Sequence, residues 1–204
     1  MNKLENYQTK YILTLVKLGN HSVLAIIALI AIGSATRVME AGLACPDWPL
    51  CYGTFLPLSH MNIRVFLEWF HRLDAFLVGL LILVQFSLSI IWRRFLPKGL
   101  LKIYSFLLFL VVFQGSLGAL TVINTLASYA VISHLLVAFS LLITATYINQ
   151  NLQNESSINS KFWWRALISI PLILTLIQSA IGVRLSSTWS AHLCLSVKQN
   201  CFIL

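Results

Sequence analysis

The amino-acid sequence predicts an all-α membrane protein, built as a four-helix transmembrane bundle followed by a fifth transmembrane helix. Of its 204 residues, 58% are hydrophobic and only 10% are charged, and the mean hydropathy is +0.84. A soluble chain of this length needs more polar side chains to cover its surface. Apolar runs recur along the whole sequence, which excludes a single soluble domain.

Five apolar segments are predicted to be transmembrane helices, because each approaches or exceeds the ~20 residues that a hydrocarbon core requires. In chain order they are residues 22–40, 65–92, 101–122, 128–148 and 164–185. Tryptophans near the segment ends are typical of the aromatic belt at a membrane surface. They are Trp69, Trp92, Trp163, Trp164 and Trp189.

The positive charges predict the topology. The net charge is +8, but Lys and Arg lie in short segments between apolar runs, so we expect no nucleic-acid partner. With the N-terminus inside, nine Lys and Arg residues fall on the inner side and five on the outer side, which agrees with the positive-inside rule. Residues 1–17 carry three lysines and no cleavage site follows them, which predicts an uncleaved cytoplasmic leader. We expect a multi-pass protein of a bacterial plasma membrane, with outer segments 41–64, 123–127 and 186–204.

A polar stretch divides the chain. Residues 149–160 read NQNLQNESSINS, so we expect a bundle over 1–148, a cytoplasmic linker over 149–163, and a fifth helix with its outer tail over 164–204. A faint internal repeat supports this boundary, because the first and the fifth span both end with a glycine and an arginine and are followed by two cysteines. The two sets are Gly33, Arg37, Cys45 and Cys51, and Gly182, Arg184, Cys194 and Cys201.

All four cysteines fall in predicted outer segments. Four cysteines allow three pairings, and the close pairs Cys45–Cys51 and Cys194–Cys201 are the natural local choice. Disulfides persist on the oxidising outer side of a bacterial membrane. Two interpretations stay open: each bridge closes a loop, or an exposed pair exchanges thiols and electrons.

Two histidines, His71 and His134, each lie six residues inside the outer end of a predicted span. At ~1.5 Å per residue, both are about 9 Å below the outer surface. Ionisable groups in hydrocarbon are costly and mark functional sites. Two imidazoles at one depth in a helical bundle predict a heme iron with two histidine ligands. The alternative for each is a satisfied core histidine.

The second span opens with further polar residues around His71. Glu68, His71 and Arg72 share one helix face, and Asp74 is placed to accept the second ring N–H of a ligating His71. The alternative is a local ion pair between Glu68 and Arg72.

Heme carries two propionates, and guanidinium groups bind carboxylates in a bidentate manner. Arg37, Arg64 and Arg72 lie at the same outer boundary and are the candidates, with interfacial snorkelling as the alternative for Arg64. Small residues of the third span, around Gln114, favour close helix packing, and Gln114 can hydrogen-bond across the core.

Four segments resemble, in the same order, the heme A synthase family of cytochrome oxidase assembly. They are GLACPDWPLCYGTFLP (42–57), EWFHR (68–72), QGSLGALTV (114–122) and SHLLVA, which contains His134. The stretch 178–195 resembles the start of the family's second half.

The resemblance implies an eight-helix protein of two related four-helix bundles, each with a histidine pair. It implies an oxidoreductase that converts the C8 methyl group of heme O to the formyl group of heme A. His71 and His134 match the histidines of the N-terminal heme pocket, Glu68 matches the acidic residue implicated in catalysis, and Cys45 and Cys51 match the first-loop cysteine pair.

The family's second half, which holds a heme b, is expected beyond the fifth helix of this chain. We therefore expect a truncated chain, one part of a split protein, or an oligomer that rebuilds the missing bundle. The partners implied are heme O and heme A, the bilayer, heme O synthase or oxidase assembly factors, and a second copy or a complementing half-protein. The alternatives are a non-enzymatic b-type cytochrome or heme carrier, and an inactive remnant.

Overall fold

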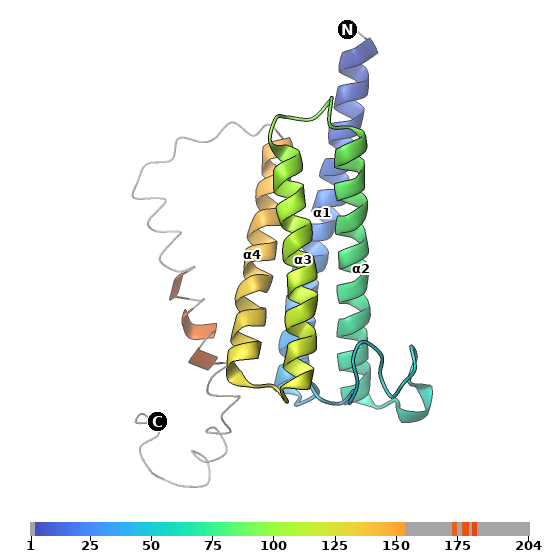
Figure 1. Cartoon of the computed structure of the whole chain (residues 1–204), viewed down its shortest axis with the longest axis vertical. Coiled ribbons are helices and arrows are strands. Elements are labelled where there is room, and N and C mark those ends of the chain that lie inside the picture. Colours follow the sequence, from blue (N-terminus) through green and yellow to red (C-terminus); the bar gives the residue numbers. More distant parts are fainter. Residues whose placement is uncertain (1–2, 154–172, 175–176, 180, 183–204) are drawn as a thin grey trace.

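The computed structural model describes residues 3–153, 173–174, 177–179 and 181–182. Four long helices form a bundle (Figure 1), and each is long and apolar enough to cross a membrane. They are α1 (Lys3–Val38), α2 (Ile63–Ile91), α3 (Leu100–Ile123) and α4 (Ser128–Leu152), with a short 3-10 helix η1 (Leu58–His60) before α2. No strand occurs in this part of the chain. The predicted all-α membrane bundle is confirmed.

The helix bounds agree with the predicted spans except at two places. α1 begins at Lys3 and its membrane-spanning part at Thr9, whereas the hydropathy pattern predicted a start at residue 22. Lys17, Asn20 and His21 interrupt the apolar run, yet all three are exposed and leave the helix intact. α4 continues to Leu152, past the expected end at residue 148.

The expected fifth span, 164–185, lies mostly outside the described residues. Within it, residues 173–174, 177–179 and 181–182 have helical backbone. The expected linker 149–163 is wrong at its start, because residues 149–152 belong to α4; its residues from 154 on and the outer tail lie outside the described residues.

The four helices enclose one shared interior. α1 packs against α2 and α4, and α3 packs against the same two helices. Short connections join α2 to α3 and α3 to α4, as in an antiparallel bundle (Figure 1). Side chains from all four helices can therefore meet inside the bundle.

The apolar core fills one half of this interior. Its buried residues include Leu15, Ile82, Tyr104 and Ile148, one from each helix. Within the same half, the Nε2 atom of Gln85 donates a hydrogen bond of 2.6 Å to Ser22 Oγ. Interhelical hydrogen bonds of this kind contribute about 0.6–2 kcal/mol in membranes. This half of the bundle is thus a packed, internally bonded structure.

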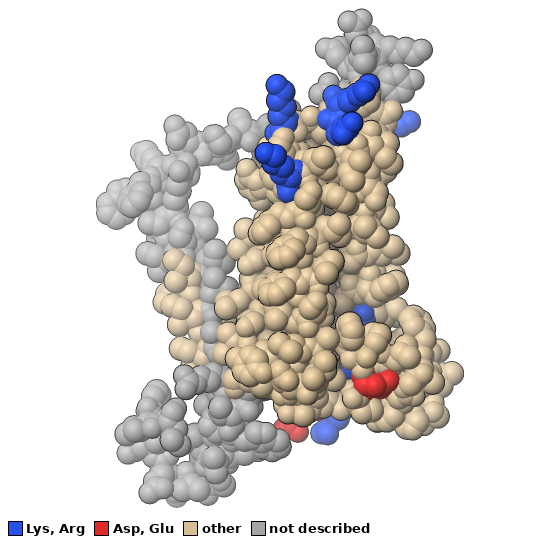
Figure 2. All heavy atoms as spheres, in the orientation of Figure 1, with Lys and Arg blue, Asp and Glu red and all other residues tan. Residues whose placement is uncertain are grey.

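Charge is divided between the two ends of the bundle. Figure 2 shows Lys and Arg gathered at the end that carries the α2–α3 connection. The exposed Lys and Arg residues of that connection and its neighbourhood are Lys10, Arg93, Arg94, Lys98 and Lys102. The opposite end carries the cysteine loop, which runs from α1 to α2, and the candidate site.

Candidate functional site

A disulfide closes the loop between α1 and α2. Cys45 and Cys51 are joined, and both side chains are almost fully buried against Val65 of α2. The predicted Cys45–Cys51 pairing is confirmed. The second predicted pair, Cys194 and Cys201, lies outside the described residues.

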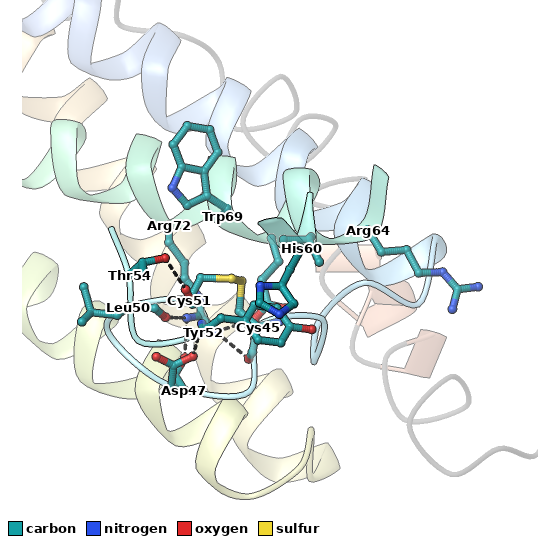
Figure 3. The surroundings of a disulfide bond; sticks show 12 residues. Cys45, Asp47, Leu50, Cys51, Tyr52, Thr54, His60, Arg64, Trp69 and Arg72 are labelled. Atoms are coloured by element: carbon teal, nitrogen blue, oxygen red, sulfur yellow. Dashed lines mark hydrogen bonds and ion pairs between the residues drawn. A yellow bond between two sulfur atoms is a disulfide. The ribbon is translucent and has the colours of Figure 1, made fainter. Parts of the chain in front are cut away.

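The guanidinium of Arg72 enters this loop from α2 (Figure 3). Its Nη1 atom donates 2.5 Å hydrogen bonds to the carbonyl oxygens of Asp47 and Leu50. Its Nη2 atom donates to the carbonyl of Cys45 at 3.3 Å and to Glu68 Oε1 at 2.5 Å. One arginine therefore holds three backbone carbonyls of the loop.

Glu68 completes the same network. Its side chain is buried, and its two carboxylate oxygens have different partners. Oε1 accepts from Arg72, and Oε2 accepts from the backbone N–H of Cys45 at 2.7 Å. The local ion pair between Glu68 and Arg72 is thus present, and together the two side chains clamp the disulfide loop onto α2.

Two loop contacts were missed by the sequence reasoning. The carboxylate of Asp47 accepts hydrogen bonds from the N–H groups of Gly53 at 2.8 Å and Tyr52 at 2.6 Å. The first of these is the main reason why the pKa of Asp47 lies below its usual value. The indole of Trp69 donates to the carbonyl of Phe55 at 2.7 Å. The partners of Asp47 lie five and six residues beyond it, farther than the two residues of an Asx turn, so neither its role nor that of Trp69 has a local sequence signal.

We expect Arg72→Gln to loosen the loop, because Glu68 would keep its buried charge without a cationic partner. Loss of one member of a buried pair costs ~3–5 kcal/mol. If only a third of this cost destabilises the closed loop, the loop opens about tenfold more often. Reduction of the Cys45–Cys51 disulfide then becomes about tenfold faster. The measurement is maleimide labelling after timed reduction, with Cys194→Ser and Cys201→Ser in the background.

Arg64→Gln is the matched control, because Arg64 is exposed and points away from the loop (Figure 3). Equal reduction rates in Arg72→Gln and the unaltered chain would contradict the clamp.

His71 lies inside the bundle against Gly33 of α1. A Cβ atom added at Gly33 would lie 2.9 Å from Cε1 of the imidazole. The expected hydrogen bond from His71 to Asp74 stays a prediction. Its Nδ1 atom is buried, with no hydrogen-bond partner among the described residues.

His134 has an equivalent setting between α3 and α4. Its Nε2 atom lies 3.3 Å from Nε2 of Gln114, the hydrogen bond across the core that the sequence suggested. A Cβ atom at Gly118 would lie 3.4 Å from its Cε1 atom. Its Nδ1 atom is likewise buried without a hydrogen-bond partner in the described part of the chain.

The two imidazoles share one environment. Each lies against a glycine of the preceding helix, and the two rings are near enough to interact electrostatically. In both rings Nδ1 is buried and has no hydrogen-bond partner within the described ranges, and in His134 Nε2 accepts from the amide nitrogen of Gln114. The described residues hold no cluster of three or more His, Cys, Asp or Glu side chains suited to a metal ion. A macrocycle that needs only two axial ligands is compatible with this set.

The remaining candidates are distributed around the same end of the bundle. Arg37 occupies the last turn of α1 and is half-buried. Arg64 is exposed, and Asp74 is half-buried. Arg72 reaches the loop and Glu68, as described above.

These features define an integral membrane protein: a polytopic helical bundle with two half-buried imidazoles near the end that carries a disulfide-closed loop. The chain belongs to the cytochrome oxidase assembly protein family, whose sequence profile matches residues 18–201. The family that the motifs suggested is thereby confirmed.

Curated relatives carry the name heme A synthase. The protein from Shewanella oneidensis is 39% identical over 132 residues, which are 56% of this chain and 38% of the relative. The protein from Bradyrhizobium diazoefficiens is 27% identical over 195 residues, which are 79% of this chain and 54% of the relative. The chain thus spans about half, or less, of the length of these relatives. No solved structure matches it.

Proposed function

We propose that this chain carries the substrate-side heme pocket of heme A synthesis, in which the C8 methyl group of heme O is oxidised to a formyl group for cytochrome oxidase. The pair of half-buried imidazoles inside the bundle, His71 and His134, is the observation that carries the proposal. The family membership and the heme A synthase relatives support it.

The two imidazoles fit an iron porphyrin by their chemistry. Bound heme would take one nitrogen ligand from each imidazole, and its iron would supply the redox chemistry. We assign His71 and His134 as the iron ligands. We assign Arg37 to a propionate. Arg72, which the sequence also suggested for a propionate, is assigned to the loop, because its donors already have four partners there.

The reaction requires proton acceptors as well as an oxidant. Conversion of a methyl group to a formyl group with water as the oxygen source releases four protons and four electrons. An external electron acceptor must take the electrons. We propose that Glu68, one helical turn from His71, takes a proton or stabilises developing positive charge, which requires that its bond to Arg72 or to the Cys45 N–H opens.

A Glu68→Gln variant tests this role. General base catalysis contributes ~10²–10⁴-fold, so we expect the variant to bind heme O and to form at least 100-fold less heme A. The measurement is extraction and chromatography of porphyrins from membranes that contain the chain and a heme O source. Retention of the Cys45–Cys51 disulfide in the variant shows that the loop is intact.

Two outcomes would contradict the proposal. Equal heme A formation by Glu68→Gln would remove Glu68 from the chemistry. Heme binding by the unaltered chain with no heme A would favour a non-enzymatic heme carrier or b-type cytochrome.

We place heme b in the part of the relatives that lies beyond the matched half. A heme O synthase as donor, an oxidase assembly factor as acceptor, and a second copy or a complementing half-protein are the proposed partners.

We further propose that the N-terminus is cytoplasmic in a bacterial plasma membrane. The concentration of Lys and Arg at the end with the α2–α3 connection supports this orientation (Figure 2). The disulfide loop then faces the oxidising side, where a disulfide persists. The reduction experiment described for Arg72 can be repeated on spheroplasts with a membrane-impermeant reductant. This reductant reduces the Cys45–Cys51 disulfide only if the loop faces outward, so the result decides the orientation.

A further inference from the structure

The cysteine loop lies beside α2 and not beyond its end. The carbonyl of Phe55 accepts its hydrogen bond from the indole of Trp69. Trp69 is six residues beyond Ile63, the first residue of α2, so its Cα lies about 9 Å along the helix. Figure 1 shows the loop alongside the first turns of α2. Part of the loop is therefore level with the membrane-spanning segment Ile63–Ile91.

The outward side chains of the loop are apolar. Phe55 is 68% exposed and Leu58 is 72% exposed. Among residues 46–58, the other exposed large apolar residues are Trp48, Leu50, Tyr52 and Leu56. Their surface continues onto α2 through exposed Ile63, Phe66 and Phe70. An exposed apolar surface of this kind marks a contact with a partner or a membrane.

Many of the polar groups of the loop are bonded within the protein. Irregular backbone at membrane depth requires such internal partners. Arg72 or Trp69 donates to four carbonyls of the loop, those of Cys45, Asp47, Leu50 and Phe55. Glu68 or Asp47 accepts from three N–H groups, those of Cys45, Tyr52 and Gly53. Asp47 is the only Asp, Glu, Lys or Arg among residues 41–62. It is bonded to backbone N–H groups.

We propose that residues 46–58 form an interfacial membrane anchor, whose apolar side chains insert among the lipids of the leaflet beside the first turns of α2. Three observations identify lipid as the occupant. The loop is level with the first turns of α2, its apolar surface continues onto the lipid-facing side of a spanning helix, and many of its backbone groups are bonded within the protein. Side chains such as Trp, Phe and Leu are those that bury into the headgroup and acyl boundary. This anchor does not depend on the proposed heme chemistry.

Photocrosslinking of the full chain in lipid nanodiscs tests the anchor. A benzophenone amino acid replaces Phe55 or Leu58, where exposed positions leave the packing unchanged. Position 76 on the exposed side of α2 is the lipid-facing control, and Lys98 in the α2–α3 connection is the water-facing control. We expect lipid adducts at positions 55 and 58 at yields at least about tenfold above those at position 98.

Other adducts would overturn the anchor. A crosslink to a second copy would assign the surface to self-association, and a crosslink to residues 154–204 would assign it to the rest of the chain. Yields no higher than at position 98 would place the loop in water. Retention of the Cys45–Cys51 disulfide in each variant shows that the loop is folded, and adducts at position 76 show that the bundle is inserted.

Discussion

Replacement of either His71 or His134 by alanine is expected to abolish retention of heme by the purified chain. Each imidazole would supply one of two bonds to a common iron. Mutation of a residue that only hydrogen-bonds to a metal ligand already lowers metal affinity by ~10–100-fold. Removal of the ligand itself should therefore lower heme affinity by at least about 100-fold. Titration of the purified protein with heme, followed by absorbance, measures the change.

Two exposed histidines provide the controls for this prediction. His21 bonds to the carbonyl of Lys17, and His60 stacks on Tyr52 at 4.0 Å. Their alanine variants should bind heme as the unaltered chain does. Heme affinity that falls equally for His60→Ala and His134→Ala would show a general loss of folding and would contradict a dedicated pair.

Gly33→Ala is expected to have nearly as large an effect, although the change adds a single methyl group. The new Cβ would lie 2.9 Å from Cε1 of His71, so the imidazole must shift. A displacement of about 1 Å can cost 10²-fold in a positioned site. We expect at least a tenfold loss of heme affinity, measured by the same titration.

The glycines of α3 give a graded comparison. A Cβ at Gly118 would meet His134 at 3.4 Å, whereas a Cβ at Gly115 would meet nothing within 4 Å. The loss should therefore decrease from Gly33→Ala to Gly118→Ala and be absent in Gly115→Ala. Equal affinity in the Gly33 and Gly115 variants would show that the contact between Gly33 and His71 does not position the ring.

Hydropathy located the second, third and fourth helices because each apolar run is bounded by polar or turn-forming residues. It failed at the start of α1, where Lys17, Asn20 and His21 interrupt the apolar run. A window average cannot distinguish polar groups on the exposed face of a continuing helix from a helix end. Leu15, which is buried beyond this interruption, shows that the helix packs there as well.

The sequence located the histidine pair through depth alone, because both rings are six residues from predicted span ends. It also offered the ion pair between Glu68 and Arg72 as an alternative, and this pair is present. The role of Arg72 in the loop was not predictable. Its partners are backbone carbonyls 22 to 27 residues away, and backbone atoms leave no residue-type signal.

The central claim is that His71 and His134 bind one iron from opposite sides. Electron paramagnetic resonance of the ferric heme-loaded chain tests it most directly, because two axial imidazoles give a low-spin iron. We predict a low-spin signal in the unaltered chain and a high-spin signal in each single alanine variant that is given excess heme. A low-spin bis-imidazole signal that persists when both histidines are replaced would contradict the account.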